Sequence, residues 1–269
     1  MNEKPTVSID KEKCIGCGIC AKDCVAKAIT IVAGKANVKS ECLYCGHCLA
    51  VCPCGAVSIP EYDMEEVETY NKDTFHVNPE QLLRSIKYRR SIRDYKPMPV
   101  EEEKLNQILQ AGRYTATAKN NQDCTFVFVQ KELDILKDKV WGFIDDIEKN
   151  KKEKKIPREV LPYISFNRQR KKNPEEDYLF RNAPVVMFVA SQWPLDAGLA
   201  SQNMENMANA QGLGVLFDGY LASIADINEE LKTWLGIEGK EIRSCMLLGY
   251  PNVKYQRTTP KRKAKVIWK

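Results

Sequence analysis

The sequence contains only two histidines, His47 and His76, and no long hydrophobic run. The longest apolar stretch, residues 183–190, is far shorter than the roughly 20 residues that a membrane-spanning helix needs. Residues 1–5 contain no apolar core of a signal peptide. Neither histidine stands in a pattern typical of acid–base catalysis. We therefore expect a cytoplasmic protein that does not use a membrane.

Recognisable nucleotide-binding patterns are also missing. There is no G-x-G-x-x-G fingerprint of a dinucleotide fold. The formal net charge of +5 is concentrated in residues 149–172 and 254–269, without an aromatic platform or a nucleic-acid motif. We expect these segments to form a solvated helical face or a patch for an anionic ligand or an acidic partner. We do not expect nucleic acid binding.

Cysteine, in contrast, is abundant, and eight of the 11 cysteines form two runs with the spacing C-x2-C-x2-C-x3-C. Each cysteine of the first run recurs 28 residues later in the second. The segment Ala28-Ile29-Thr30-Ile31 recurs with the same offset as Ala56-Val57-Ser58-Ile59. The pattern indicates a duplicated half-domain. The two runs are Cys14, Cys17, Cys20 and Cys24, and Cys42, Cys45, Cys48 and Cys52.

This spacing is typical of two [4Fe–4S] clusters, each held by three close thiolates and by the fourth thiolate of the other run. Gly16, Gly18 and Gly46 allow the backbone to turn close to the cluster. Zinc, which prefers pairs of C-x2-4-C, suits the pattern poorly. We therefore predict one cluster on Cys14, Cys17, Cys20 and Cys52, and a second on Cys42, Cys45, Cys48 and Cys24.

Residues 5–60 closely resemble a bacterial dicluster ferredoxin. The resemblance departs at Val25, where that family usually has a proline after the fourth cysteine, whereas Pro53 is present in the second run. Cys54 is an additional thiol, which we interpret as a small packing residue and not as a ligand. The three cysteines outside the runs are scattered, which is typical of a reducing compartment.

The rest of the chain predicts a second domain. Residues 1–60 form the ferredoxin domain, 61–78 an acidic linker, and 79–269 a domain in which helical periodicity alternates with apolar strands. This alternation predicts an α+β fold, a central sheet clad in helices. We expect helices from Pro79, over 100–112, over 197–211 capped by Asp196, and over 227–235, charged helical structure within 132–180, and strands at 125–129, 184–190, 215–217 and 244–250.

Three arginines and a serine follow the first of these helices as Arg89, Arg90, Ser91 and Arg93. Guanidinium groups match the geometry of a phosphate, so the cluster indicates an anion site. Taken alone, such a run is also compatible with a solvated surface.

Residues 81–269 resemble the nitroreductase-like FMN family along their whole length. The motif at 89–95 is similar to the phosphate-binding start of that family, and residues 115–122 take the place of its A-P-S-x-x-N-x-Q loop. Thr117 keeps a hydroxyl in that loop, whereas Ala116 replaces the proline. Further similar segments in the right order are 196–203, 212–214, 248–251 and 260–262.

The resemblance implies specific roles. Arg89, Arg90, Ser91, Arg93 and Arg262 would hold the FMN phosphate, Thr117, Asn120 and Gln122 would lie at the flavin, and backbone N–H groups around Ala197 and Gly198 would face its N5/O4 edge. It also implies a homodimer with flavin at the subunit interface.

Together, the two resemblances indicate a flavin-dependent oxidoreductase that takes electrons through two [4Fe–4S] clusters to FMN. The acceptor would be a nitroaromatic, a quinone or an activated alkene, and the donor reduced ferredoxin, hydrogenase or NAD(P)H. Two alternatives stay open: an electron-transfer or redox-sensing module without small-molecule turnover, and a specialised cofactor-modifying flavoenzyme. No catalytic residue is assigned.

Overall fold

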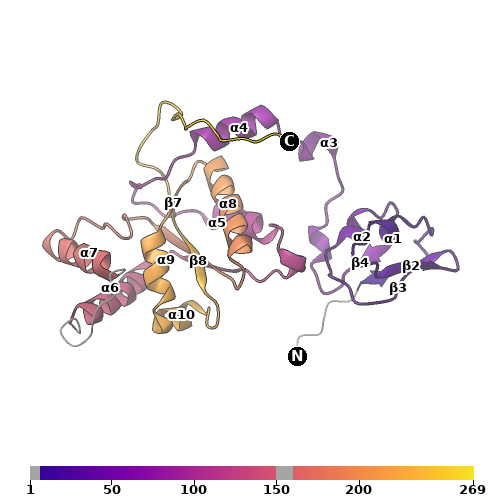
Figure 1. Ribbon diagram of the computed structural model, residues 1–269, viewed down its shortest axis with the longest axis horizontal. Helices are drawn as coiled ribbons and strands as arrows, with labels where there is room; N and C mark the ends of the chain where they lie inside the picture. Colours follow the sequence, from indigo (N-terminus) through magenta and orange to yellow (C-terminus); the bar gives the residue numbers. More distant parts are fainter. Residues whose placement is uncertain (1–6, 150–159) are drawn as a thin grey trace. The chain divides into compact units, whose positions relative to one another are not determined.

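The computed structural model describes residues 7–149 and 160–269. Residues 1–6 and residues 150–159 of the basic segment lie outside this description. The chain divides into two compact units, one of Met1–His76 with Ala118–Asn121 and one of Val77–Thr117 with Gln122–Lys269. Figure 1 shows the elements of both, and each unit is described by itself below.

The first unit repeats its structure as well as its sequence. Helices α1 (Ile19–Asp23) and α2 (His47–Ala50) each begin after a glycine in the left-handed region, Gly18 with φ 77° and Gly46 with φ 73°. Strand β1 (Ser8–Ile9) pairs antiparallel with β4 (Val57–Ser58), and β2 (Ile29–Val32) pairs antiparallel with β3 (Lys35–Val38).

The core of this unit is small and includes three cysteines of the paired runs. Cys14, Cys20 and Cys48 are buried together with short aliphatic side chains of the strands. Domains of this size rarely gain enough stability from an apolar core alone. The fold therefore depends on what the cysteines bind.

The acidic segment predicted as a linker contains two short helical elements, η1 (Met64–Glu66) and α3 (Lys72–Phe75). Each begins at a side-chain cap, since Asp63 accepts from the N–H of Glu65 and Asn71 from that of Asp73. These elements are held by local contacts and contain no buried residue.

The second unit is built on a four-stranded antiparallel sheet with the order β5-β6-β8-β7. The strands are β5 (Thr125–Val129), β6 (Val185–Ala190), β7 (Gly214–Phe217) and β8 (Ile242–Gly249). Every residue of β6 is buried, as its continuous apolar sequence predicts. Val186 and Phe188 enter the core on one face, and Val185 and Met187 the core on the other.

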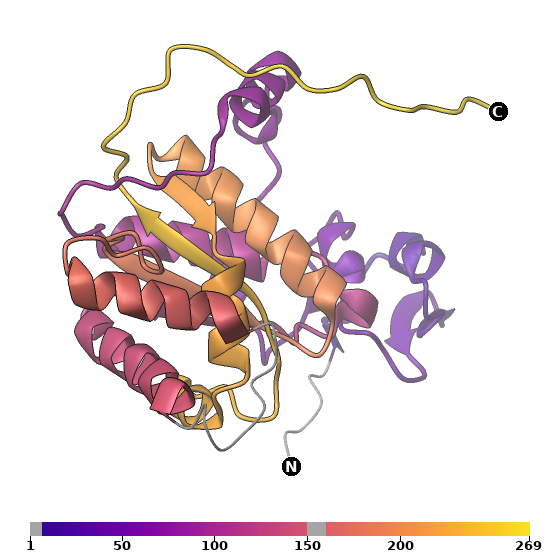
Figure 2. The same cartoon turned by 60° about the vertical axis from the view of Figure 1, so that its left-hand side comes forward.

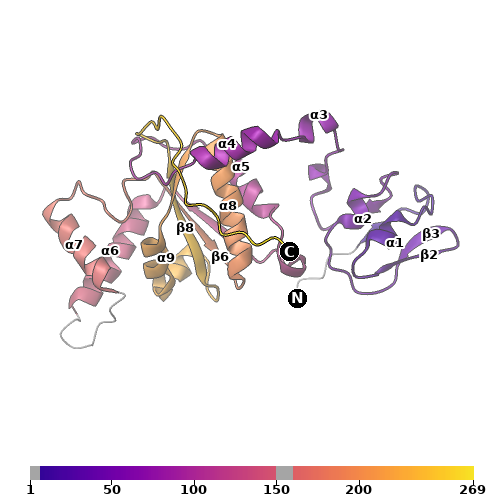
Figure 3. The ribbon, with the colours of Figure 1, turned by 45° about the horizontal axis from the view of Figure 1, so that its top comes forward.

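Helices cover both faces of this sheet, which confirms the predicted α+β class (Figures 2 and 3). On one face lie α5 (Glu102–Arg113) and α8 (Pro194–Ala210). On the other lie α6 (Leu133–Lys149), α9 (Gly219–Asp226) and α10 (Glu229–Leu235), and α7 (Leu161–Lys172) packs on α6. Within residues 7–149 and 160–269, no helix is long and apolar enough to cross a membrane.

Two details of the predicted helices were wrong. Asp196 is not the N-cap of the long helix, because α8 already begins at Pro194 after Trp193. The proline fixes the first turn two residues earlier than the acidic residue suggested. Helix α9 was not anticipated, although Asp218 caps it by accepting from the N–H of Leu221 at 2.8 Å.

Helix α4 (Pro79–Tyr88) contains no buried residue. Its apolar side chains Leu82, Leu83 and Ile86 are all about half exposed. The C-terminal tail lies beside it, since the hydroxyl of Tyr88 donates to the carbonyl of Tyr255 (Figure 2). Helix α4 also contacts α8, since Asn209 Nδ2 donates to the Ser85 hydroxyl at 2.9 Å, but its apolar side chains stay only partly covered by the described residues.

Candidate functional site

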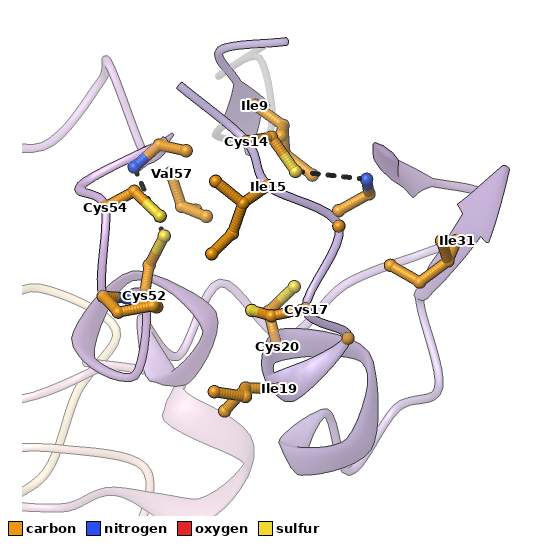
Figure 4. Close-up of a pocket in the computed structure, with 15 residues that line it drawn as sticks. Ile9, Cys14, Ile15, Cys17, Ile19, Cys20, Ile31, Cys52, Cys54 and Val57 are labelled. Carbon is orange, nitrogen blue, oxygen red and sulfur yellow. Dashed lines mark hydrogen bonds between the residues drawn. The ribbon is translucent and has the colours of Figure 1, made fainter. Parts of the chain in front are cut away.

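Four thiols converge on one cavity of the first unit. Cys14, Cys17 and Cys20 reach it from the first run, and Cys52 reaches it from the second (Figure 4). The empty space among the lining residues is about 360 Å³, open solvent included. Cys54 lines the same cavity as a fifth thiol.

The reciprocal set surrounds a second cavity. Cys42, Cys45 and Cys48 line it together with Cys24 of the first run. All 11 cysteines are free thiols. In the described part of the chain, no three His, Cys, Asp or Glu side chains converge closely enough to hold a single ion. Each set of four thiols thus surrounds a cavity, and the cysteines are grouped as crossed ligation of two [4Fe–4S] clusters requires.

Backbone N–H groups point at four of these sulfur atoms. Such N–H···S hydrogen bonds stabilise added negative charge on a thiolate or on a cluster that it holds. Two of these hydrogen bonds are related by the sequence offset of the duplication. In each run, the N–H of an alanine after the fourth cysteine donates to the sulfur of that cysteine. The pairs are Ala36 to Cys14 at 3.4 Å, Ala28 to Cys24 at 3.3 Å, Tyr44 to Cys42 at 3.2 Å and Ala56 to Cys52 at 3.3 Å.

The thiols differ in acidity. The N–H of Ala36 is the main cause that lowers the pKa of Cys14. Burial raises the pKa of Cys20, and it raises that of Cys48 to about 11. Ionising the two buried thiols requires a compensating positive charge, which iron supplies when it binds them.

Gly16 is the closest backbone contact in the first cysteine run. It has φ 71°, and a Cβ built on it would lie 2.0 Å from the carbonyl oxygen of Gly34. No other residue fits this position without moving the β2–β3 turn. The β2–β3 turn therefore packs directly against the loop that contains Cys14 and Cys17.

In the second unit, the predicted phosphate residues occupy the segment after α4. Nη1 of Arg89 lies 2.9 Å from Oε1 of the buried Glu205. Nη1 of Arg90 donates to the carbonyls of Lys87 and Arg89, at 3.0 and 2.5 Å. Nε and Nη2 of Arg90 are buried and have no hydrogen-bond partner among the described residues. These two nitrogens form the edge of a guanidinium that fits a phosphate.

The neighbouring residues are held by the sheet. The N–H of Ile92 donates to the carbonyl of Val215 at 3.0 Å, and Ser91 bridges to the same residue. Nη1 of Arg93 lies 3.5 Å from the carbonyl of Ser91, and its side chain is exposed. Arg262 lies in the exposed tail.

Helix α8 contacts both the arginine segment and Thr115. Besides binding Arg89 through Glu205, it donates from Asn203 Nδ2 to the hydroxyl of Thr115 at 2.7 Å. Glu205 is not among the residues predicted from the sequence. The available signal was its spacing from Ala197 and Ser201, which places a carboxylate on the buried face of a helix, where it needs a cation.

The loop itself is strained. Lys119, Asn120 and Gln122 all have φ between 50° and 56°, a region that costs non-glycine residues energy and that often marks functional segments. The hydroxyl of Thr117 accepts from the N–H of Gln122 at 3.0 Å. Within the first unit, Nδ2 of Asn120 donates to the carbonyls of Leu43 and Tyr44, at 3.2 and 3.1 Å.

The start of α8 provides the remaining predicted residues. The N–H of Ala197 already donates to the carbonyl of Trp193 at 3.2 Å, so in this structure it is not available to a ligand. Gly198 is exposed, and nothing lies within 4 Å of a Cβ built on it. A ligand has room to approach this side of α8 closely.

Two groups of four thiols in one unit, followed in the same chain by an α+β unit, are typical of a redox protein with an iron–sulfur domain. Comparison with known families agrees: residues 86–250 match the nitroreductase family, and residues 6–53 match the 4Fe-4S dicluster domain. The chain belongs to the nitroreductase family and carries an N-terminal 4Fe–4S dicluster domain, as the sequence predicted. It is an oxidoreductase of that family.

Individual relatives are distant. A "Putative NADH dehydrogenase/NAD(P)H nitroreductase" of Methanothermobacter thermautotrophicus is 28% identical over 180 residues, 63% of this chain and 77% of that protein. A nitroreductase from Bacteroides fragilis with bound FMN is 25% identical and has a TM-score of 0.56, covering 72% of this chain and 100% of its own. One from Desulfitobacterium hafniense with bound FMN is 22% identical, has a TM-score of 0.53 and covers 71% and 100%.

Proposed function

We propose that this protein takes single electrons into two [4Fe–4S] clusters, transfers them to FMN and reduces an electrophilic organic substrate. The observation that carries the proposal is the combination, in one chain, of two four-thiol cavities with a nitroreductase fold whose Arg90 has two buried nitrogens without a partner. FMN supplies the conversion between one- and two-electron transfer when it is bound.

The phosphate of FMN is the anion that we assign to Arg90. Arg89, Ser91, Arg93 and the tail residue Arg262 complete this predicted site. Arg89 contributes less positive charge to this site than the sequence alone suggests, because the carboxylate of Glu205 neutralises its guanidinium group. Thr117, Asn120, Gln122 and Gly198 stay predicted flavin contacts, whereas the predicted N–H of Ala197 donates within α8 to Trp193.

The cluster ligands follow from the cavities. We propose that Cys14, Cys17, Cys20 and Cys52 hold one cluster, and that Cys24, Cys42, Cys45 and Cys48 hold the other. Joining the iron–sulfur domain covalently to the flavin domain raises its effective concentration at the flavin.

The acceptor is a nitroaromatic, a quinone or an activated alkene, and the donor is reduced ferredoxin, hydrogenase or NAD(P)H. The relative named as an NAD(P)H nitroreductase makes NAD(P)H with a nitroaromatic the first pair to assay.

We also propose a homodimer. Exposed apolar side chains that an interface could cover are Leu82, Leu83 and Ile86 of α4, and Leu195 and Leu199 at the start of α8. A second copy of the chain is the partner that the family resemblance implies.

Anaerobic stopped-flow spectroscopy tests the electron path. The purified protein should contain about eight irons and one FMN per chain. On mixing with a reductant, bleaching of the clusters should precede bleaching of the flavin. Clusters that reduce while the flavin stays oxidised would contradict the coupled function.

An anaerobic assay of nitro compounds, quinones and enones tests the enzymatic part. Turnover of at least one class supports the proposal. Reduction of the flavin without turnover of any of them, together with a stable complex with a protein partner, would support a redox-sensing module instead.

A further inference from the structure

The two cavities of the first unit differ in the charges that lie next to them. The β2–β3 hairpin packs against the loop of Cys14, with Gly34 touching Gly16. From this hairpin, Nζ of Lys35 donates to the carbonyl oxygen of Cys14 at 2.6 Å. An ammonium group is thus fixed next to the backbone of one predicted ligand.

A second ammonium group is held in the same region. Nζ of Lys11 donates to the carbonyl of Ala36, the residue whose N–H points at the Cys14 sulfur, and to Oδ1 of Asn37 at 2.6 Å. The hydrogen bonds keep the two lysines in place, although Lys11 is exposed to solvent.

The second cavity has a different environment. Among the described residues that line it, His47 is the only ionisable side chain besides the thiols, and Nδ1 of His47 lies 3.1 Å from Oδ2 of Asp23. Asp23 brings a negative charge close to the wall of this cavity. The duplication therefore gives two similar thiol sets, and among the described residues the hairpin holds two hydrogen-bonded ammonium groups, those of Lys35 and Lys11, next to the first set.

Positive charge next to a cluster favours its reduced form, because reduction adds one negative charge. We infer that Lys35, assisted by Lys11, makes the cluster held by Cys14, Cys17, Cys20 and Cys52 the more easily reduced of the two. One electron from the donor converts this cluster from its oxidised to its reduced form, and no bond or proton changes. The first electron that enters the domain would then be held by this cluster, and the second electron would reduce the other cluster. This inference rests on the proposed function only in that both clusters are bound.

The test is an anaerobic redox titration of the full-length protein, followed by electron paramagnetic resonance. Wild type should show two one-electron steps at different potentials. In Lys35→Met, the midpoint potential of the upper step should fall. The decrease should correspond to a three- to tenfold change in the equilibrium constant of reduction, where tenfold corresponds to 59 mV. The midpoint potential of the lower step should change less, so the difference between the two potentials should become smaller. Lys11→Met should act in the same direction but less, because Lys11 is exposed and screened.

Lys35→Arg is the matched control, since it keeps the charge and a donor for the Cys14 carbonyl. It should keep the wild-type gap, which separates the effect of charge from that of packing. Iron content is measured for every variant. A protein without clusters overturns both this inference and the proposed function. A protein with about eight irons whose upper step does not fall in Lys35→Met, or falls equally in Lys35→Arg, overturns this inference alone.

Discussion

Arg89 and Glu205 form an ion pair of 2.9 Å between the segment after α4 and the middle of α8. The two side chains differ in burial, since that of Arg89 is 33% exposed and that of Glu205 is 2% exposed. The pair connects residues 116 positions apart in the chain. It fixes the start of the predicted phosphate site to the helix that also holds Thr115.

The unequal burial predicts unequal costs of breaking this pair. Arg89→Met leaves a buried carboxylate without its cation, although Gln202 Nε2 still donates to Glu205 Oε2 at 2.9 Å, and should lower the free energy of unfolding by about 3–5 kcal/mol. Glu205→Gln leaves a partly exposed guanidinium and should cost about 1–3 kcal/mol. Denaturant unfolding followed by tryptophan fluorescence reports on this unit, because all four tryptophans belong to it. Equal costs, or a larger cost for Glu205→Gln, would contradict the interpretation.

Arg90 should behave differently, because its Nε and Nη2 have no partner among the described residues. Arg90→Met should weaken FMN binding at least tenfold, through loss of a charge-assisted contact with phosphate. The stability of the apoprotein should change little, because the loss of the two Nη1 hydrogen bonds to Lys87 and Arg89 is offset by the removal of two buried nitrogens without a partner among the described residues. Flavin fluorescence titration and thermal unfolding measure both effects, with Lys87→Met as the control on exposed α4. Unchanged FMN affinity in Arg90→Met would exclude Arg90 from the site.

Gly16→Ala should reduce the iron content of the purified protein by half or more. The added Cβ would meet the carbonyl of Gly34 at 2.0 Å and would also be strained at φ 71°. Gly18→Ala is the matched control, because Gly18 has φ 77° but its nearest neighbour lies at 3.9 Å. If both variants lose iron equally, backbone strain rather than the contact with the hairpin is responsible.

Asp123 joins the end of the 115–122 loop to β6. Its Oδ2 accepts from the Ser191 hydroxyl and the Gln192 N–H, and Lys240 lies 3.1 Å from its Oδ1. Burial would raise the pKa of Asp123, but these three partners lower it below the usual value. A carboxylate with a lowered pKa stabilises the folded state above its unfolded pKa, and this contribution is lost as the pH falls through the folded pKa.

Asp123→Asn should therefore destabilise the second unit by about 1–3 kcal/mol at pH 7. The difference from wild type should be constant from pH 8 to about pH 5 and should shrink below about pH 4, where wild type loses the charge as well. Tryptophan-monitored unfolding across this range measures it. A difference that grows on acidification would show that another group controls the effect.

The exposed face of α4 predicts the oligomeric state. Ile86→Glu should convert the homodimer to a monomer by placing a charge in an apolar interface. Light scattering after size-exclusion chromatography measures the mass, and Gln81→Glu on the same helix is the control. A monomeric wild-type protein, or a dimer that Ile86→Glu leaves intact, would exclude this face from an interface.

Much of the fold was predictable because its signals are local. The position of β5 and the buried character of β6 followed from short apolar runs. Helix α9 was missed since its eight residues are shorter than a reliable periodic pattern, and the cap at Asp218 was the only other signal. The start of α8 was misplaced because an acidic residue in a first turn and an N-cap look alike in sequence.

The cysteine spacing alone predicted two crossed sets of four thiols, because the fourth cysteine of each run lies too far along the chain to close the same cube. It could not determine that the sets have different surroundings. Only the tertiary structure places Lys35 at Cys14, Glu205 at Arg89 and the free edge of Arg90 in a buried position. The reason is physical: ligand spacing is a property of adjacent residues, whereas charge pairing and burial depend on which distant segments pack together.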